Sequence, residues 1–140
     1  MAKPLARRSF LSTVKPMPAN SPEQTAQLLA DALKAGDLEA AVALYEADAI
    51  FIPDLGQSVT GAAAIREAFA GFVAAKPILT IETVVSAISG DIALIQNNWT
   101  MKTTEADGSP VEGTGQSVEA LRRQADGTWK FVIDNPWGAR

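Results

Sequence analysis

The chain contains no histidine and no cysteine among its 140 residues. Their absence excludes nucleophile pairs of the Ser–His and Cys–His kinds, an imidazole general base and any disulfide. It also removes the side chains from which most zinc sites are built. Proton transfer by this protein would have to use carboxylates, lysines, hydroxyls, fixed dipoles or its one tyrosine, Tyr45.

Other patterns that indicate a ligand or a partner are also missing. Neither the GxGxxG spacing of dinucleotide sites nor the Walker A spacing occurs. Carboxylates alone would hold a hard cation weakly at best, so we expect no metal and no cofactor. The net charge of −4 and the lack of a basic cluster beyond Arg7-Arg8 and Arg122-Arg123 argue against nucleic acid. No apolar run approaches the roughly 18 residues that a membrane helix needs.

Residues 1–20 are expected to form a tail or arm. Arg7-Arg8-Ser9-Phe10-Leu11 is similar to a twin-arginine export motif, but the residues that follow lack the apolar segment of such a signal. We therefore expect a cytoplasmic protein with one domain over residues 21–140. A hydrophobic content of 47% is enough for a core of its own.

Helix signals occupy the N-terminal half. Ser21-Pro22-Glu23-Gln24 combines a hydroxyl N-cap, a proline at the first helical position and a capping glutamine, and Gly36 can end the helix that begins there. Asp37 is placed to cap a second helix. One face of that helix would carry Leu38, Val42 and Tyr45.

A short strand and a third helix should follow. Ile50-Phe51-Ile52 is β-branched and aromatic, which is typical of a strand. A loop bounded by Pro53, Gly56 and Gly61 comes next. Thr60 is placed to cap a third helix. Its apolar side would consist of Ile65, Phe69, Phe72 and Val73.

From residue 78 onwards the pattern changes to long strands separated by turn sequences. Asp126-Gly127 is one such turn. Long strands joined by tight turns form an antiparallel meander, so the chain predicts an α+β fold with three N-terminal helices packed on a curved antiparallel sheet. The expected strands are 78–88, 92–103, 111–124 and 128–136.

The last predicted hairpin brings two acidic residues together. If Ala125 lies opposite Thr128 across the turn, Glu119 lies directly opposite Asp134. Two carboxyl groups that face each other in a pocket tend to share a proton, with one pKa raised. That arrangement suits a general acid or base, so Glu119 and Asp134 are the candidate catalytic residues.

Two alternatives stay open for this pair. A one-residue bulge in the turn would place the two side chains on opposite faces of the sheet. Both carboxylates could also point to solvent, or pair with Lys130, Arg123 or Arg66 as ordinary structural groups.

Alternation in the strand at 92–103 predicts which side chains line the pocket. The odd-numbered residues from Ala93 to Met101 are the more apolar set, so that face should point inward. It would present Trp99 as a flat wall and Asn97 as a hydrogen-bonding group, as small-molecule sites do. The candidate ligand-binding residues are Tyr45, Phe51, Phe69, Asn97, Trp99 and Asn135, although Tyr45, Asn97 and Trp99 could equally serve the core.

The other face of the final strand carries Trp129, Phe131 and Ile133 if the strand alternates regularly. With Asp134 on the concave face, these apolar groups would lie on the convex face and need a cover. We expect a homodimer through that face.

Residues 33–72 resemble the opening of the SnoaL-like and nuclear-transport-factor-2-like (NTF2-like) superfamily, to which ketosteroid isomerase is distantly related. The resemblance rests on a helix stopped by Ala35-Gly36-Asp37, a second short helix, a strand interrupted by Pro53 and Gly56, and a third helix after Thr60. The ending at residues 121–130 is similar to that of the DUF4440 type. The resemblance implies a cone-shaped fold with a central pocket.

Compared with ketosteroid isomerases, the chain has Pro53 where they carry an aspartate base and Leu29 where they carry a tyrosine donor. Glu119 matches their second, protonated acid. Asp54 lies one residue beyond the base position and would point out of the pocket. The resemblance therefore does not imply isomerase chemistry by that mechanism.

Two classes of function remain. The first is a pocket that binds a small, largely apolar carbonyl or hydroxyl compound, with isomerase-, cyclase- or hydrolase-like acid–base chemistry on the carboxylates. The second is a non-catalytic association domain whose cone is filled by side chains. A cavity of roughly 300 Å³ or more favours the first.

Overall fold

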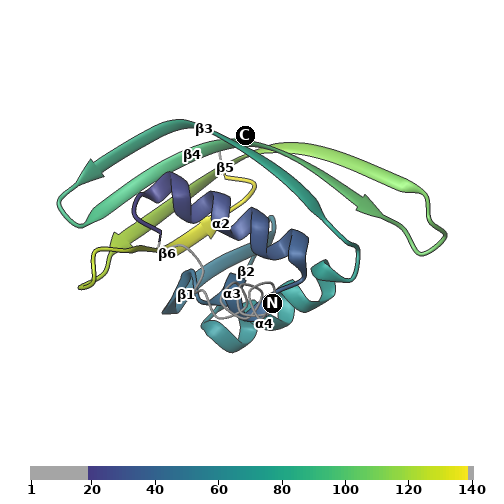
Figure 1. Cartoon of the computed structure of the whole chain (residues 1–140), viewed down its shortest axis with the longest axis horizontal. Coiled ribbons are helices and arrows are strands. Elements are labelled where there is room, and N and C mark those ends of the chain that lie inside the picture. Colours follow the sequence, from purple (N-terminus) through teal and green to yellow (C-terminus); the bar gives the residue numbers. More distant parts are fainter. Residues whose placement is uncertain (1–18, 139–140) are drawn as a thin grey trace, which may run out of the picture.

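The computed structural model describes residues 19–138, in which a six-stranded curved sheet arches over three helices (Figure 1). The predicted α+β fold is confirmed. The elements are α2 Pro22–Ala35, α3 Leu38–Val42, β1 Tyr45–Asp54, β2 Gln57–Thr60, α4 Ala62–Val73, β3 Ile78–Ser89, β4 Ile92–Thr104, β5 Pro110–Arg123 and β6 Trp129–Asn135.

The predicted tail falls almost wholly on residues 1–18, outside the described residues. Ala19 is described and is buried, and its carbonyl accepts a hydrogen bond from the Trp129 N–H at 2.9 Å. In the described part of the chain, no helix is both long and apolar enough to cross a membrane.

Helix α2 has the ends that its sequence predicts. Ser21 Oγ accepts a hydrogen bond from the Gln24 N–H, and Gln24 Oε1 accepts one from the Asn20 N–H. Gly36 ends the helix in the left-handed conformation, with φ of 72°. The apolar side of α2 packs against the concave face of the sheet and helps to form the core.

The second helix is shorter than predicted. Asp37 caps it as expected, but α3 ends at Val42 and Tyr45 begins strand β1. The placement of Tyr45 on a helix face was therefore wrong. The strand predicted at residues 50–52 extends from Tyr45 to Asp54, and its first inward side chain is the Tyr45 ring.

The predicted loop before α4 contains a further strand. Residues Gln57–Thr60 form β2, which pairs with β1. Thr60 ends that strand and does not cap α4, whose N-cap is Gly61 with no side-chain hydrogen bond. Helix α4 itself buries Ile65 and Phe69 as predicted.

The sheet has the order β2-β1-β6-β5-β4-β3. Strands β3 to β6 form the predicted antiparallel meander, with boundaries within a residue or two of those expected. The one departure from an antiparallel sheet is the β1–β6 pair, which is parallel. Because β1 lies beside the last strand, residues that are distant in the sequence meet on the concave face.

The β5–β6 hairpin contains two irregularities that offset each other. Next to the turn, Arg123 pairs with Trp129, so the turn is one residue longer than predicted. Farther along, Ala120 pairs with Ile133 but Leu121 pairs with Phe131, which leaves Val132 as an extra residue in β6. A bulge of this kind shifts the register by one residue. Glu119 consequently does lie opposite Asp134.

The same bulge makes the prediction for the outer face of β6 wrong. Trp129 and Phe131 are 4% and 1% exposed and lie in the core of their own chain, on the same side as Asp134. The physical reason is that the extra residue, Val132, reverses the alternation between Phe131 and Asp134. Only Ile133, at 40% exposure, faces outward.

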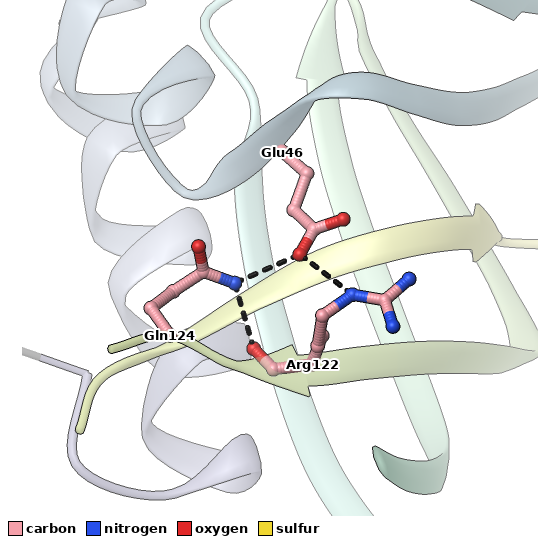
Figure 2. Close-up of polar contacts among 3 residues, drawn as sticks. All are labelled: Glu46, Arg122 and Gln124. Carbon is pink, nitrogen blue, oxygen red and sulfur yellow. Dashed lines mark hydrogen bonds and ion pairs between the residues drawn. The ribbon is translucent and has the colours of Figure 1, made fainter. Parts of the chain in front are cut away.

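A polar cluster joins β1 to β5 across β6. Figure 2 shows the Glu46 carboxylate of β1 reaching over β6, where Oε2 accepts hydrogen bonds from Arg122 Nε at 2.9 Å and Gln124 Nε2 at 2.8 Å. Gln124 Nε2 also donates to the Arg122 carbonyl. These bonds connect the two strands that flank the bulged β6.

The surface available for the predicted homodimer changes, because Trp129 and Phe131 are buried in the core. The outer face carries an apolar row across four strands, in which Ala87 pairs with Leu94, Leu94 with Ala120, and Ala120 with Ile133. Leu94 is 43% exposed. We propose that a second copy covers this row through a two-fold, sheet-to-sheet contact, because such an interface needs one self-complementary patch.

The dimer predicts that Leu94→Asp yields a monomer at micromolar concentration, because a carboxylate would be buried against an apolar partner. Sedimentation velocity measures this directly. Leu55→Asp is the matched control, since Leu55 lies in the β1–β2 turn and is 64% exposed. A monomeric wild type, or a Leu94→Asp variant that sediments like the wild type, would contradict the proposal.

Candidate functional site

A cavity of about 360 Å³ occupies the space between the helices and the concave face of the sheet. Its walls are mainly apolar and come from α2, α4 and the strands, including Leu29, Phe72, Ile81 and Met101. The exposed Val111 lines one end, so the cavity opens near the tip of the β4–β5 hairpin.

Most of the predicted site residues line this cavity. The inward face of β4 was predicted correctly, because Ala93, Ile95, Asn97 and Trp99 are all buried. The cavity walls include the predicted residues Glu119, Asp134, Phe51, Phe69, Asn97 and Trp99.

Glu119 and Asp134 lie side by side at the inner end. They are 5% and 3% exposed and their side chains are hydrogen-bonded to each other. Among the described residues neither carboxyl group takes part in an ion pair, since the ion pairs join other acidic residues to arginines. Their pairing with Lys130, Arg123 or Arg66 is therefore not observed.

Two donors support the pair from opposite sides. The Tyr45 hydroxyl donates a hydrogen bond to Asp134 Oδ2, and the ring of Tyr45 is fixed by Phe69 and Phe131. On the other side, Asn97 Nδ2 donates to Glu119 Oε1 at 2.9 Å. Both carboxyl groups are thus held by groups that are themselves buried.

The Asn97 amide is oriented by two further residues. Thr83 Oγ1 donates to Asn97 Oδ1 at 2.6 Å, so Nδ2 of the amide must point to the opposite side. There it donates to Glu119 and, at 3.3 Å, to Ser117 Oγ. The hydrogen bonds therefore run from Thr83 through Asn97 to the carboxyl pair.

Burial and mutual repulsion hold a proton on the pair. Burial, followed by the nearby Asp134 charge, raises the pKa of Glu119 to about 10. Burial also raises the pKa of Asp134, although hydrogen bonds from Glu119 and Tyr45 oppose that rise. Burial and then the Asp134 charge raise the pKa of Tyr45 well above its usual value, so its hydroxyl stays a donor.

At neutral pH the pair therefore keeps at least the proton of Glu119. Loss of the remaining proton would put two charges in an apolar cavity, which is costly. Gain of a second proton only neutralises the pair. Whenever Asp134 is ionised, the arrangement can accept a proton and return it, which is the behaviour of a general base.

Tyr45 and Asn135 are the predicted ligand-binding residues that do not line the cavity. Tyr45 belongs to β1 and not to a helix, and its hydroxyl contacts Asp134 without lining the cavity itself. Asn135 Oδ1 accepts a hydrogen bond from the Trp137 N–H and so stabilises the turn after β6. Both act on the site through other residues.

Thr83, Ser117 and Trp137 were missed. Thr83 and Ser117 lie opposite Asn97 on the neighbouring strands, so the predicted strand pairing could have identified them. Trp137 follows the end of β6, where strand alternation makes no prediction. Among residues 19–138 no group of three or more acidic side chains could hold a metal ion.

The positions compared with ketosteroid isomerases fall where the resemblance implies. Pro53 and Leu29 both line the cavity, and neither side chain can transfer a proton. Asp54 is exposed and does not line it. The cavity therefore has acid–base groups at the Glu119–Asp134 end, and none at the base position of those isomerases.

Comparison with protein families matches residues 26–132 to a family described as the SnoaL-like domain. The comparison with curated proteins found no match.

Solved structures with the same fold include a ketosteroid isomerase-like protein from Erwinia carotovora, with 20% identity, a TM-score of 0.71, and coverage of 80% of this chain and 88% of that one. An NTF2-like protein of unknown function from Shewanella oneidensis has 18% identity, a TM-score of 0.66, and coverage of 79% and 91%. A protein from Xanthomonas campestris, provisionally described as a calcium/calmodulin-dependent protein kinase II association domain, has 20% identity, a TM-score of 0.69, and coverage of 76% and 77%. Similarity at these identities shows the fold alone.

The shared proton predicts how stability depends on pH. The pKa of Glu119 is raised from an unfolded value of about 4.3, so its stabilising contribution is complete below that pH and is lost as pH rises towards the folded value of about 10. Glu119→Gln removes the group whose titration causes this loss of stability. The glutamine amide can still form hydrogen bonds with Asn97 and Asp134. The stability of this variant relative to wild type should rise with pH, by up to about 1.4 kcal/mol per pH unit.

Denaturant unfolding at a series of pH values between 5 and 9 measures the difference. Glu67→Gln on the exposed face of α4 is the control and should show no trend. A constant difference between wild type and Glu119→Gln would contradict the shared proton.

Proposed function

Because the chain belongs to the SnoaL-like domain family, we propose that it binds a small, largely apolar molecule in the cavity and moves a proton on it. The observation that carries this proposal is a buried, paired carboxyl group at the inner end of a cavity of about 360 Å³. This volume exceeds the roughly 300 Å³ at which small-molecule sites begin.

The walls specify the ligand's chemistry. Leucine, isoleucine, methionine and aromatic side chains provide most of the surface, and the polar groups are concentrated around Glu119 and Asp134. A fitting ligand has an apolar body and one carbonyl or hydroxyl at the inner end. A charged group elsewhere on the ligand would lose its hydration without a partner.

Asp134 is the base in the proposed step. It takes a proton from a C–H next to the ligand's carbonyl, or from a hydroxyl, and the electron pair stays on the ligand. Tyr45 and Glu119 hold Asp134 in place through hydrogen bonds. The neutral pair then returns the proton to the same or another atom, as in exchange, isomerisation or cyclisation.

The alternative is a non-catalytic association domain. It would require a cone filled by side chains, and the cavity volume argues against that. One observation favours the association domain, namely the apolar row on the outer face of the sheet. Membership of the DUF4440 type within the superfamily stays a prediction from the ending at residues 121–130.

The proposed step predicts that the protein accelerates exchange of the α-protons of 1-tetralone, a neutral bicyclic ketone, in D₂O. Nuclear magnetic resonance follows the exchange. Asp134→Asn should lower the protein-dependent rate by about 100-fold or more, because proton transfer by a positioned base contributes about that much. Calorimetry should show that 1-tetralone binding changes far less.

Glu67→Gln is the matched control, because it removes an exposed carboxylate outside the cavity. Binding without any acceleration by the wild type would leave a binding pocket and remove the catalytic step. Failure of the wild type to bind ketones at all would contradict the proposal as a whole.

A further inference from the structure

We propose that Trp137 sets the size of the largest ligand that the cavity accepts. We also propose that Gly115, by having no side chain, lets the Trp99 ring lie close to the sheet and so keeps the wall formed by Trp137 and Trp99 out of the cavity. The inference deepens the proposed function, because it names the residues that select among apolar ligands by size. The inference rests on the proposed function in one respect only, namely that the cavity binds a ligand.

Trp137 occupies a gap that the sheet topology creates. Strand β6 lies between β1 and β5 but ends at Asn135, opposite Val118. Strand β5 begins eight positions earlier than Val118, at Pro110, so a stretch of it has no β6 residue beside it. Pro136 and Trp137 line the cavity just beyond the end of β6.

Two indole N–H groups hold this segment in place. Trp137 Nε1 donates to the Pro53 carbonyl of β1 at 2.9 Å, and Trp99 Nε1 of β4 donates to the Pro136 carbonyl at 2.8 Å. The two indole rings meet edge to face, with centroids 5.4 Å apart. The segment is therefore tied to β1 on one side and to β4 on the other, and these contacts close the wall.

Gly115 determines where the Trp99 ring lies. It pairs with Trp99 across β4 and β5, and a Cβ atom added to it would lie 2.4 Å from Trp99 Cζ2 and 2.7 Å from Cε2. Real Cβ atoms do not approach other atoms so closely, so a side chain here forces the indole away from the sheet. Because Trp99 lines the cavity and its ring meets that of Trp137, the displaced indole is expected to take up cavity space on that side.

The two residues should thus change size selection in opposite directions. Loss of the Trp137 ring lengthens the cavity and favours larger ligands. A methyl group at position 115 pushes Trp99 inward and favours smaller ones.

Benzene, naphthalene and phenanthrene test this, because they differ in size and carry no oxygen for the carboxyl pair. Calorimetry and fluorescence give the dissociation constants. Trp137→Ala should improve the affinity for phenanthrene relative to benzene by about tenfold or more, and Gly115→Ala should worsen it by about the same factor, as expected for the gain or loss of a well-packed apolar group.

Two further variants separate wall effects from misfolding. Trp137→Phe keeps an aromatic ring but removes the N–H that binds Pro53, and should shift the ratio in the same direction by a smaller factor. The double variant Gly115→Ala/Trp99→Phe should recover most of the wild-type ratio, because the smaller ring relieves the collision. Circular dichroism checks each fold.

Gly71→Ala is the control for a glycine replacement, since a Cβ there meets nothing within 4 Å and Gly71 does not line the cavity. Affinity ratios within about twofold of wild type in both Trp137→Phe and Gly115→Ala, or no hydrocarbon binding by the wild type, would overturn the inference. If the ratios shift as expected while 1-tetralone exchange is not accelerated, only the proposed proton transfer fails.

Discussion

The extra residue in β6 is the constraint on which the site depends. Without Val132 as a bulge, the register near the turn would place Asp134 opposite Val118 and turn its side chain outward. With the bulge, Phe131 and Asp134 both face the cavity, and Phe131 packs against the ring of Tyr45. One unpaired backbone position thus brings the carboxyl pair, its tyrosine donor and the aromatic core onto the same side of the sheet.

Burying two carboxyl groups has consequences for their surroundings. Each must be satisfied by hydrogen bonds or neutralised, because an unpaired charge in the core costs several kcal/mol, of the order of 3–5. Here the pair keeps a proton, and Tyr45 and Asn97 supply the donors. In the described residues no buried side-chain nitrogen or oxygen lacks a partner. The site is therefore preorganised. Its buried carboxyl groups still lower the free energy of unfolding at neutral pH, because the pKa of Glu119 is raised.

The sequence predicted regular features well and irregular ones poorly. Alternation identified the inward face of β4, because that strand pairs with β5 without interruption. The Glu119–Asp134 pairing was correct only because a longer turn and a bulge offset each other. The longer turn was one of the open alternatives, but the bulge at Val132 was not predicted. Trp129 and Phe131 were misplaced for the same reason. Tyr45 was assigned to a helix since helical spacing and a strand start cannot be told apart over so few residues. Trp137 lies after a strand end, where no periodicity applies.

The apolar lining of the cavity, which contains no lysine or arginine, gives the cavity a further property. An ionised weak acid that enters would lose the hydration of its carboxylate, and the residues lining the cavity offer no cation in return. Only the protonated, neutral form of the acid avoids this cost. The cavity should therefore select by ionisation state as well as by shape, and at a pH above the ligand's own pKa its apparent affinity for a carboxylic acid would fall about tenfold for each further pH unit. Binding of such compounds would therefore increase as the medium becomes more acidic, just as the partitioning of a weak acid from water into an oil does.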